Sequence, residues 1–354
     1  MKDSKAIGLE LISKLSPPNV PASQVGGPAI KHPGFPIKAF GNDRMSSMHR
    51  NSSIFIVGHK DGIEHSLLAH FAARGFKNVF SNNKDNIDVL NQAKTAKFFK
   101  QVKPEYVFLG SFRSGGIAAN QKYPGEFIHE NCQAQNNVIH AAYLNGAQKL
   151  LYFASSCVYP KEAKQPIREG ALLTGPLEET SEAYAVAKIA GIKMCQAYQA
   201  QYGFNAAAVV PATLYGPGSD DDLETAHVMG ALIGKFHKAA REGKKEVVVW
   251  GTGRPHREFL YVDDFTAACV FLMDKYNDGD LINIGGGHDV SIKTLAGMIA
   301  AATGFKGKIV FDASQPDGAM RKLLDNRRIT RLGWKPKVGL EEGIKKTVEG
   351  IKNI

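Results

Sequence analysis

The sequence has few cysteines and no long hydrophobic run. No stretch of about 18 consecutive apolar residues occurs, which excludes a membrane-spanning helix. The four cysteines are scattered and form no CxxC pair, so we expect no disulfide framework, no zinc ribbon and no other metal site. No charged segment followed by a short apolar one opens the chain, so a secretory signal is not expected. These absences predict a cytoplasmic protein without a membrane partner.

The charge balance is positive. The chain has 44 Lys and Arg against 34 Asp and Glu, a formal net charge of +10. Such an excess suits a nucleic acid or a small anionic ligand such as a nucleotide diphosphate. The basic residues are dispersed, with only short clusters such as Lys244-Lys245 and Arg327-Arg328, whereas a dedicated nucleic-acid binder carries a contiguous basic face. The sequence therefore favours the small anionic ligand, and nucleic acid is not expected as a partner.

Residues 1–52 differ from the rest of the chain. They hold 6 of the 16 prolines, and their only helix-like stretch is residues 6–15. We expect a Pro-rich N-terminal extension that is disordered or loosely docked. An arm that staples an oligomer is the alternative.

From Ser53 onward, buried-type strands alternate with helical patterns. Strands are predicted at 54–57, 79–80, 106–109, 150–154 and 206–211, with long helices at 126–145 and 182–202. This alternation is typical of βαβ units and predicts an α/β fold with a doubly wound, Rossmann-type parallel sheet over residues 53–214. Residues 215–354 are expected to form a smaller C-terminal α/β substrate lobe, part of which returns to the main sheet. Its predicted helices are 228–241, 263–276 and 292–303, and its predicted strands are 246–250, 281–284 and 308–311.

A glycine-containing turn follows the first predicted strand. Glycines there let the backbone approach a pyrophosphate, and the following helix supplies N–H donors. The turn has Gly58 and Gly62 but no third glycine, and Asp61 and Glu64 would place negative charge near the phosphates. The sequence thus predicts a Rossmann-type turn, while its two carboxylates count against cofactor binding.

The end of the second strand bears on the choice of cofactor. No acidic residue stands there to grip a ribose 2′-hydroxyl. Lys60 and Lys84 could instead meet a 2′-phosphate, which favours NADP(H) over NAD. The alternative is that both lysines are solvated surface residues.

A Ser, a Tyr and a Lys form the more specific pattern. Ser155 stands at the end of a predicted strand, and Tyr184 lies 29 residues later on a predicted helix, four residues before Lys188. Residues four apart share one face of a helix, and an ammonium beside a phenol lowers the phenol pKa. This pattern suits proton exchange with a carbonyl oxygen.

Longer stretches carry a family resemblance, which extends from about Ser53 to the C-terminus. These are GGIAAN (115–120), SSCVYPKEAKQP (155–166), EAYAVAKIAGIKMC (182–195), VVVWGTGRPHREFLYVDD (247–264) and FDASQPDGAMRKLLD (311–325). The chain resembles the extended short-chain dehydrogenase/reductase superfamily and, within it, the GDP-L-fucose synthase family. The resemblance implies a homodimeric nucleotide-sugar enzyme that epimerises GDP-4-keto-6-deoxy-mannose at C3 and C5 and reduces C4 with NADPH.

The resemblance also implies roles for individual residues. The position of Cys157 matches the epimerisation base and that of His227 its partner acid, while Ser155 and Tyr184 would hold the ketone oxygen and Lys188 would support Tyr184. Expected contacts to the GDP-sugar are Lys235, Trp250, Arg257, Asp317 and Lys322. Expected contacts to the cofactor are Gly58, Lys60, Gly62, Ile63, Lys84, Leu90, Lys188, Pro211 and Leu214.

Nearly all departures from the family pattern lie on the cofactor side. The substituted positions are Asp61 and Glu64 for glycines, Asn91 for an aspartate, Gly110-Ser111-Phe112-Arg113 for small residues and a lysine, and Ala212-Thr213 for Thr-Asn. They leave two alternatives to the complete reaction. One is an epimerase or related GDP-sugar enzyme with a lost or altered reductase step. The other is a non-catalytic GDP-sugar-binding homologue, against which the retained Ser, Cys, Tyr, Lys and His count.

Overall fold

A six-stranded parallel sheet forms the centre of the molecule. The computed structural model describes residues 47–59, 62–218, 228–315 and 317–352. The sheet order is β2-β1-β3-β4-β5-β9, and every neighbouring pair is parallel. The strands are β1 (Ser53–Val57), β2 (Asn78–Ser81), β3 (Tyr106–Leu109), β4 (Lys149–Phe153), β5 (Ala206–Pro211) and β9 (Ile282–Ile284). Strands β3 and β4 are buried throughout, as strands covered on both faces should be.

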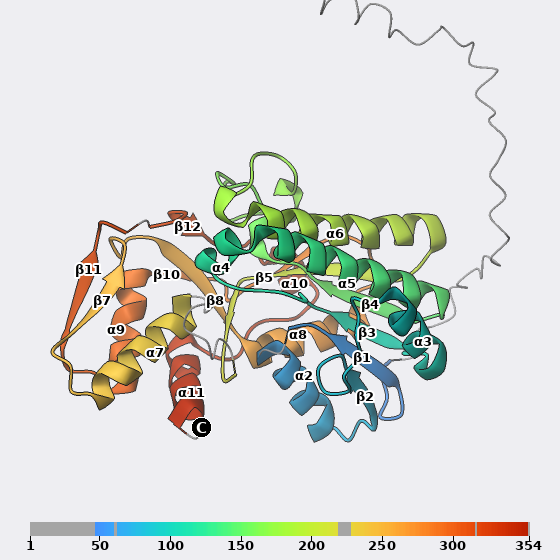
Figure 1. Ribbon diagram of the computed structural model, residues 1–354, viewed down its shortest axis with the longest axis horizontal. Coiled ribbons are helices and arrows are strands. Elements are labelled where there is room, and N and C mark those ends of the chain that lie inside the picture. Colours follow the sequence, from blue (N-terminus) through green and yellow to red (C-terminus); the bar gives the residue numbers. More distant parts are fainter. Residues whose placement is uncertain (1–46, 60–61, 219–227, 316, 353–354) are drawn as a thin grey trace, which may run out of the picture. The chain divides into compact units, whose positions relative to one another are not determined.

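Helices cover both faces of this sheet (Figure 1). Helices α3 (Gln92–Val102), α5 (Pro124–Leu144) and α6 (Glu182–Tyr202) pack side by side on one face. Helices α2 (Gly62–Ala73) and α8 (Val262–Lys275) pack together on the other. The predicted doubly wound α/β fold is confirmed.

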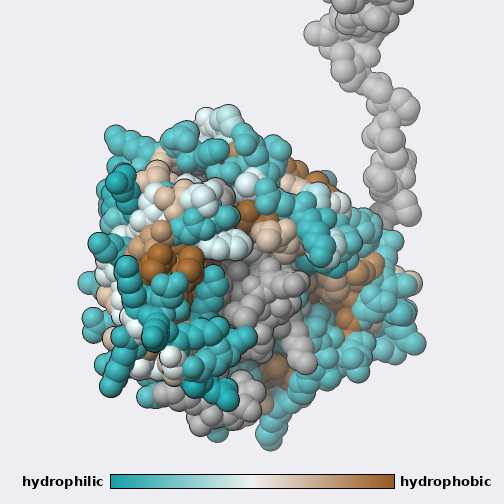
Figure 2. All heavy atoms as spheres, turned by 60° about the vertical axis from the view of Figure 1, so that its left-hand side comes forward, coloured by the Kyte–Doolittle hydropathy of each residue, from teal (hydrophilic) through white to brown (hydrophobic). Residues whose placement is uncertain are grey.

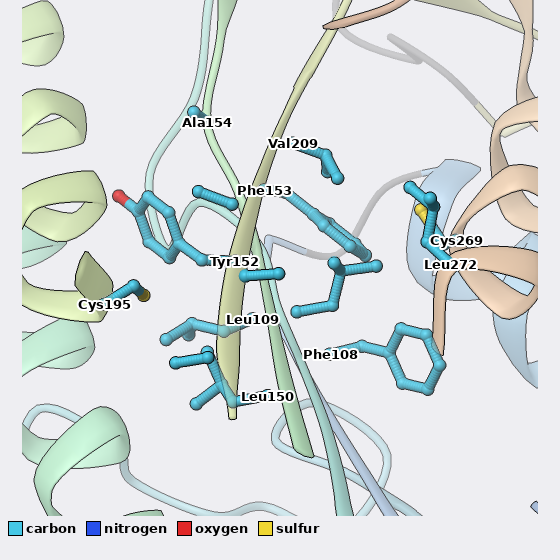
Figure 3. Packing of buried hydrophobic residues seen from close by; sticks show 14 of the residues in the cluster. Phe108, Leu109, Leu150, Tyr152, Phe153, Ala154, Cys195, Val209, Cys269 and Leu272 are labelled. Atoms are coloured by element: carbon cyan, nitrogen blue, oxygen red, sulfur yellow. The ribbon is translucent and has the colours of Figure 1, made fainter. Parts of the chain in front are cut away.

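Side chains along β4 point alternately to the two faces of the sheet and contribute to the core on both (Figure 3). Tyr152 points to the α5–α6 side, where its hydroxyl donates to Gln135 Oε1 at 2.7 Å. Phe153 points to the α8 side, where its ring centroid lies 5.1 Å from that of Phe265. Successive residues of a strand face opposite ways, so one buried strand holds both helical layers on the sheet.

The C-terminal part has a second hydrophobic core of its own. It contains β8 (His256–Tyr261), flanked by β6 (Thr213–Tyr215), β10 (Asp289–Ser291) and β12 (Arg321–Lys322), and the pair β7 (Glu246–Trp250) and β11 (Lys308–Asp312). Helices α7 (Val228–Arg241), α9 (Ile292–Thr303) and α11 (Leu340–Lys352) pack around these strands. The core residues include Phe236, Leu295, Ile299, Phe305 and Ile344. In contrast, β9 lies in the main sheet beside β5.

Four of the described strands, β6, β8, β10 and β12, were not foreseen from the sequence, and the reason is clearest for β8 and β6. Strand β8 begins with the polar residues His256, Arg257 and Glu258, which give neither an alternating nor a continuous apolar pattern. Glu258 is nevertheless buried, because its carboxylate accepts the backbone N–H groups of Gly287 and Leu324, each at 2.8 Å. Strand β6 exists because it pairs with β8. Tertiary hydrogen bonding therefore decides both strands.

The remaining short helices are α4 (Ile117–Lys122) and α10 (Arg327–Arg331). Of the expected N-terminal extension, residues 1–46 lie outside the described part of the chain. None of the described helices is both long and apolar enough to cross a membrane. Hydrophilic residues cover most of the face shown in Figure 2, with hydrophobic residues gathered in separate patches.

Candidate active site

A crevice for a dinucleotide lies where the order of the strands reverses. In a doubly wound sheet, ligands bind at the carboxyl ends of the strands on either side of that point, here β1 and β3. Gly58 follows β1 and Gly110 follows β3, and the Gly110 N–H donates to the Val57 carbonyl at 2.6 Å. A Cβ on Gly110 would stand only 3.1 Å from that carbonyl oxygen. Glycine thus allows the two backbones to meet closely at the crevice.

The unusual phosphate loop is held by amide side chains from the end of β2. The Gly58 N–H donates to Asn82 Oδ1 at 2.9 Å, and Asn83 Nδ2 donates to the Gly58 carbonyl at 3.0 Å. Asn83 Nδ2 also donates to Glu64 Oε2 at 2.7 Å. The carboxylate of Glu64, which the sequence placed near the phosphates, is therefore buried and bonded to the end of β2. Lys60 and Asp61 lie outside the described residues.

The other expected cofactor residues are spread around this crevice. Gly62 begins α2, and Ile63 follows it. Lys84 is exposed just after β2, with its backbone N–H bonded to Ser81 Oγ at 2.9 Å. Leu90, Pro211 and Leu214 are half-buried, the last two in β5 and β6.

Asn91 is the N-cap residue of α3. Its side chain accepts the Lys94 backbone N–H at 3.0 Å and caps the helix. The amide therefore replaces the family's aspartate in a position that either residue type can fill.

Ser155 and Cys157 lie in a short turn after β4. The Cys157 backbone N–H donates to Ser155 Oγ at 3.4 Å, and the Cys157 thiol is buried. Burial raises the thiol pKa, while the hydrogen bond to Ser155 and the charges of Lys322 and Lys188 lower it in part. This cysteine thus sits beside two cations.

Tyr184 and Lys188 face the same region from α6. The Tyr184 hydroxyl lies 2.7 Å from Ser111 Oγ, and its ring packs edge-on against Phe127. Lys188 is 1% exposed, and its Nζ lies 4.5 Å from the centroid of the Tyr152 ring. Burial lowers the pKa of Lys188 to about 7. The predicted Ser-Tyr-Lys set is thus brought to the carboxyl ends of β3 and β4.

A close helix–sheet contact fixes Lys188. Gly191, one turn further along α6, lies so near β4 that a Cβ there would stand 2.3 Å from Tyr152 Cζ. Only glycine lets α6 approach Tyr152 to this distance. The Lys188 ammonium thereby reaches the face of the same ring.

On the opposite side of Cys157 lie two cations of the second sheet. Lys322 of β12 and Arg257 of β8 are paired residues in the parallel ladder. The positive charge of Lys322 acts on Cys157, and Glu178 lies near both cations. The sequence analysis did not single out Glu178, and no pattern there marks it.

The Asp317 carboxylate is hydrogen-bonded to a neighbouring turn. Its carboxylate accepts the Thr252 backbone N–H and the Thr252 hydroxyl, both at 2.7 Å. These hydrogen bonds lower its pKa. Asp317 therefore shapes the 251–253 turn next to Arg257, which differs from the direct substrate contact that the sequence suggested.

Lys235 and Trp250 form an exposed pair on the second lobe. Trp250 is 66% exposed, and Lys235 Nζ lies 5.3 Å from its ring centroid. No described contact joins this pair to Cys157 or Tyr184. His227 lies outside the described residues.

A groove in the described part of the chain lies apart from these residues. It has a volume of about 850 Å³ and a basic rim that includes Lys164, Arg168, Arg327 and Arg331. None of the predicted site residues lines it. The candidate active site is the group of Ser155, Cys157, Tyr184 and Lys188, which brings together a buried thiol, a buried lysine and two hydroxyls. The described residues contain no group of His, Cys, Asp and Glu that could hold a metal ion.

Comparison with known proteins defines the class. Residues 56–285 match the profile of the NAD dependent epimerase/dehydratase family. The chain therefore belongs to this family and, by the relatives that follow, to its GDP-L-fucose synthase branch.

Similar proteins include GDP-L-fucose synthase 1 of Arabidopsis thaliana, 46% identical over 90% of this chain and 98% of the relative. GDP-L-fucose synthase of Escherichia coli is 42% identical over 84% of this chain and 95% of its own length. Among solved structures, an NADP-bound GDP-mannoheptose C4 reductase from Campylobacter jejuni has a TM-score of 0.78 at 40% identity. It is covered completely, and 86% of this chain aligns with it.

Proposed function

We propose that this protein converts GDP-4-keto-6-deoxy-mannose to GDP-L-fucose, by epimerisation at C3 and C5 and NADPH-dependent reduction at C4. The observation that carries the proposal is the meeting of a buried thiol, a buried lysine and a tyrosine hydroxyl beside Lys322 and Arg257. A purely binding protein has no need of this set.

In the epimerisation, Cys157 removes a proton from a carbon next to the ketone. Such protons are acidic only if the developing enolate oxygen is stabilised, which the hydroxyls of Ser155 and Tyr184 do. Lys322 and Lys188 favour the Cys157 thiolate by their charge. His227 returns a proton on the opposite face.

In the reduction, Tyr184 gives its proton to the C4 oxygen, and Lys188 stabilises the resulting phenolate. NADP(H), when bound, supplies the hydride that reaches C4. The crevice between β1 and β3 fits this cofactor, because backbone alone lines it at Gly58 and Gly110 and Glu64 is bonded to Asn83. The expected cofactor contacts are Gly58, Lys60, Gly62, Ile63, Lys84, Leu90, Lys188, Pro211 and Leu214.

The GDP-sugar would lie along the second sheet. Arg257 offers a guanidinium fork for the diphosphate, Lys322 adds a second cation, and Trp250 with Lys235 gives an exposed face for the nucleotide. Asp317 holds the adjoining turn. In this proposal residues 53–214 bind the dinucleotide and residues 215–354 bind the sugar nucleotide.

The two alternatives to the complete reaction, an epimerase without the reductase step and a non-catalytic binding protein, are not favoured. A lost reductase step was suggested by Asp61 and Glu64 in the phosphate loop. Asp61 lies outside the described residues, and the Glu64 carboxylate is bonded within the protein. Relatives that match most of the chain are named GDP-L-fucose synthases.

We also propose a homodimer. The outer surfaces of α5 and α6 carry a half-buried aromatic cluster of Tyr143, Tyr198 and Tyr202, next to the exposed His140. Tyrosines are enriched in the cores of interfaces, so a second copy is the expected occupant. Light scattering should give the mass of two chains, and Tyr198→Glu should give the mass of one. The four free thiols support a reducing compartment, the cytoplasm, as its location.

The deciding experiment separates the two half-reactions. With GDP-4-keto-6-deoxy-mannose in deuterated water, the protein should incorporate deuterium at C3 and C5 without NADPH, and it should oxidise NADPH when that is added. Cys157→Ser should lose exchange, and Tyr184→Phe should lose NADPH oxidation. Cys269→Ser is the matched control, because Cys269 is a buried cysteine of α8, on the other face of the sheet from α6 (Figure 3). This variant should keep both deuterium exchange and NADPH oxidation. Exchange without NADPH oxidation would leave an epimerase, and neither activity in folded protein would refute the proposal.

A further inference from the structure

Ser111 occupies a position where the family has a small residue, and its hydroxyl lies against the catalytic tyrosine. Ser111 Oγ and the Tyr184 hydroxyl oxygen are 2.7 Å apart, a good distance for a hydrogen bond between hydroxyls. Ser155, the serine expected from the sequence, bonds instead to the Cys157 backbone N–H. The tyrosine thus has a hydroxyl partner from the loop after β3, which the sequence analysis did not identify as its partner.

The segment that carries Ser111 is held rigidly from α5. Asn131, which is 2% exposed, accepts the backbone N–H groups of Phe112 and Arg113 at 2.9 and 3.3 Å. It returns a hydrogen bond to the Arg113 carbonyl at 2.9 Å. The Arg113 guanidinium is bound in turn by Glu126 and Glu130, each at 2.8 Å. The unusual Ser-Phe-Arg sequence is therefore a braced element.

The same segment also touches the phosphate loop. The His59 N–H donates to the Ser111 carbonyl at 2.6 Å, next to the bond between Gly110 and Val57. Ser111 thus links the cofactor crevice, through its backbone, to Tyr184, through its side chain. Because the Ser111 hydroxyl is already held in place, no further conformational entropy is lost when it is positioned for catalysis.

We propose that Ser111 is a positioning residue for the reduction, which holds the Tyr184 hydroxyl toward the C4 oxygen and donates to its phenolate. The proposal rests on the proposed function. The C4 carbon takes the hydride, and the C4 oxygen takes the proton of Tyr184, which is left for the substrate because the Ser111 hydroxyl donates to the Tyr184 oxygen. The phenolate that forms keeps this hydrogen bond. Solvent later returns the proton to Tyr184.

The surroundings of Tyr184 make this donor important. The titratable groups on the elements packed around it are Lys188 on the same helix, Tyr152 on β4, whose pKa Tyr184 helps to raise, and the Arg113–Glu130 pair beyond Phe127. Burial lowers the pKa of Lys188 to about 7, which weakens the positive charge that stabilises the phenolate above neutral pH. A hydroxyl donor does not lose its effect with pH in this range.

The test compares Ser111→Ala with Ser114→Ala, which removes a hydroxyl from the same loop where no hydrogen bond of the described residues is made. Ser111→Ala should lower kcat for NADPH oxidation about tenfold with little change in KM for the GDP-sugar. The pKa that limits kcat on the alkaline side should rise by about one unit, because the phenolate loses a donor. Ser114→Ala should match the unaltered protein, and Ser111→Thr, which keeps the hydroxyl, should restore the pH profile.

The outcomes are distinguishable. If the unaltered protein oxidises no NADPH with the keto-sugar, the proposed function fails before Ser111 is tested. If it is active and Ser111→Ala keeps its rate and pH profile, the role of Ser111 is overturned. A lower rate with an unmoved pH profile, or an equal loss in Ser114→Ala, also overturns it. If Ser111→Ala does not fold, Ser111→Gly removes the same hydroxyl and is read in the same way.

Discussion

Replacing Gly191 by alanine tests the close packing that fixes Lys188. An added Cβ would stand 2.3 Å from Tyr152 Cζ, 2.4 Å from its hydroxyl and 2.8 Å from Gln135 Oε1. Tyr152 is fully buried and donates to Gln135, whose amide donates to the Ala187 carbonyl at 2.9 Å. Neither side chain can move away without breaking a buried hydrogen bond.

The magnitude follows from three contributions. Overpacking a core costs about 1–3 kcal/mol, and a buried hydroxyl left without its partner costs about 1–3 kcal/mol. Alanine in a helix returns about 1 kcal/mol relative to glycine. The free energy of unfolding should therefore fall by about 3 kcal/mol, and Tm by about 6 °C at about 2 °C per kcal/mol.

The assay is urea unfolding followed by circular dichroism, with Gly297→Ala as the control. Gly297 lies in the interior of α9, is exposed, and has no atom within 4 Å of an added Cβ. That substitution should stabilise the protein by about 0.5–1 kcal/mol. If Gly191→Ala were as stable as Gly297→Ala, the inferred contact between α6 and β4 would be wrong. A folded Gly191→Ala should also lose kcat, because Lys188 is displaced.

Four further predictions concern the site. Because burial raises the pKa of Cys157, deuterium exchange into the keto-sugar should increase up to about tenfold per pH unit between about pH 7 and 9; a flat profile would show that another group is the base. Asp317→Ala should raise KM for the GDP-sugar up to about tenfold, since the turn at Thr252 loses two hydrogen bonds that anchor it; steady-state kinetics checks this, and an unchanged KM contradicts it. Trp250→Ala should weaken GDP binding in calorimetry about fivefold without loss of stability, because the ring is 66% exposed; a large drop in Tm would mean that the ring is structural. Lys84→Ala should weaken NADPH binding more than NADH binding, and equal effects would exclude a 2′-phosphate contact.

Local patterns in the sequence were sufficient for the main elements. The continuous apolar runs at 54–57 and 106–109, bounded by turn residues, predict buried strands and form β1 and β3. The periodic stretches 228–241 and 292–303 form helices with those bounds. The four-residue spacing of Tyr184 and Lys188 places them on one face of α6 whatever the rest of the chain does. These features depend on neighbours in sequence, which the sequence itself displays.

Contacts between segments distant in the sequence could not be predicted from these local patterns. Strand β8 is polar at its start and exists through Glu258, whose partners come from residues 287 and 324. The Glu64 carboxylate accepts a hydrogen bond from Asn83, which follows a different strand. No rule based on residue spacing predicts this contact.

The active site shows the same division. Ser155, Tyr184 and Lys188 were predicted from residue types and their spacing, and Cys157 from the family resemblance. The partner of the Tyr184 hydroxyl was not, because Ser111 lies 73 positions earlier and meets Tyr184 only when β3 and α6 pack around β4 and α5. The sequence by itself determined which chemical groups are available, since these are properties of single residues and their near neighbours. The tertiary structure alone decided which of them touch, because a hydrogen bond of 2.7 Å between distant segments depends on the packing of everything between them.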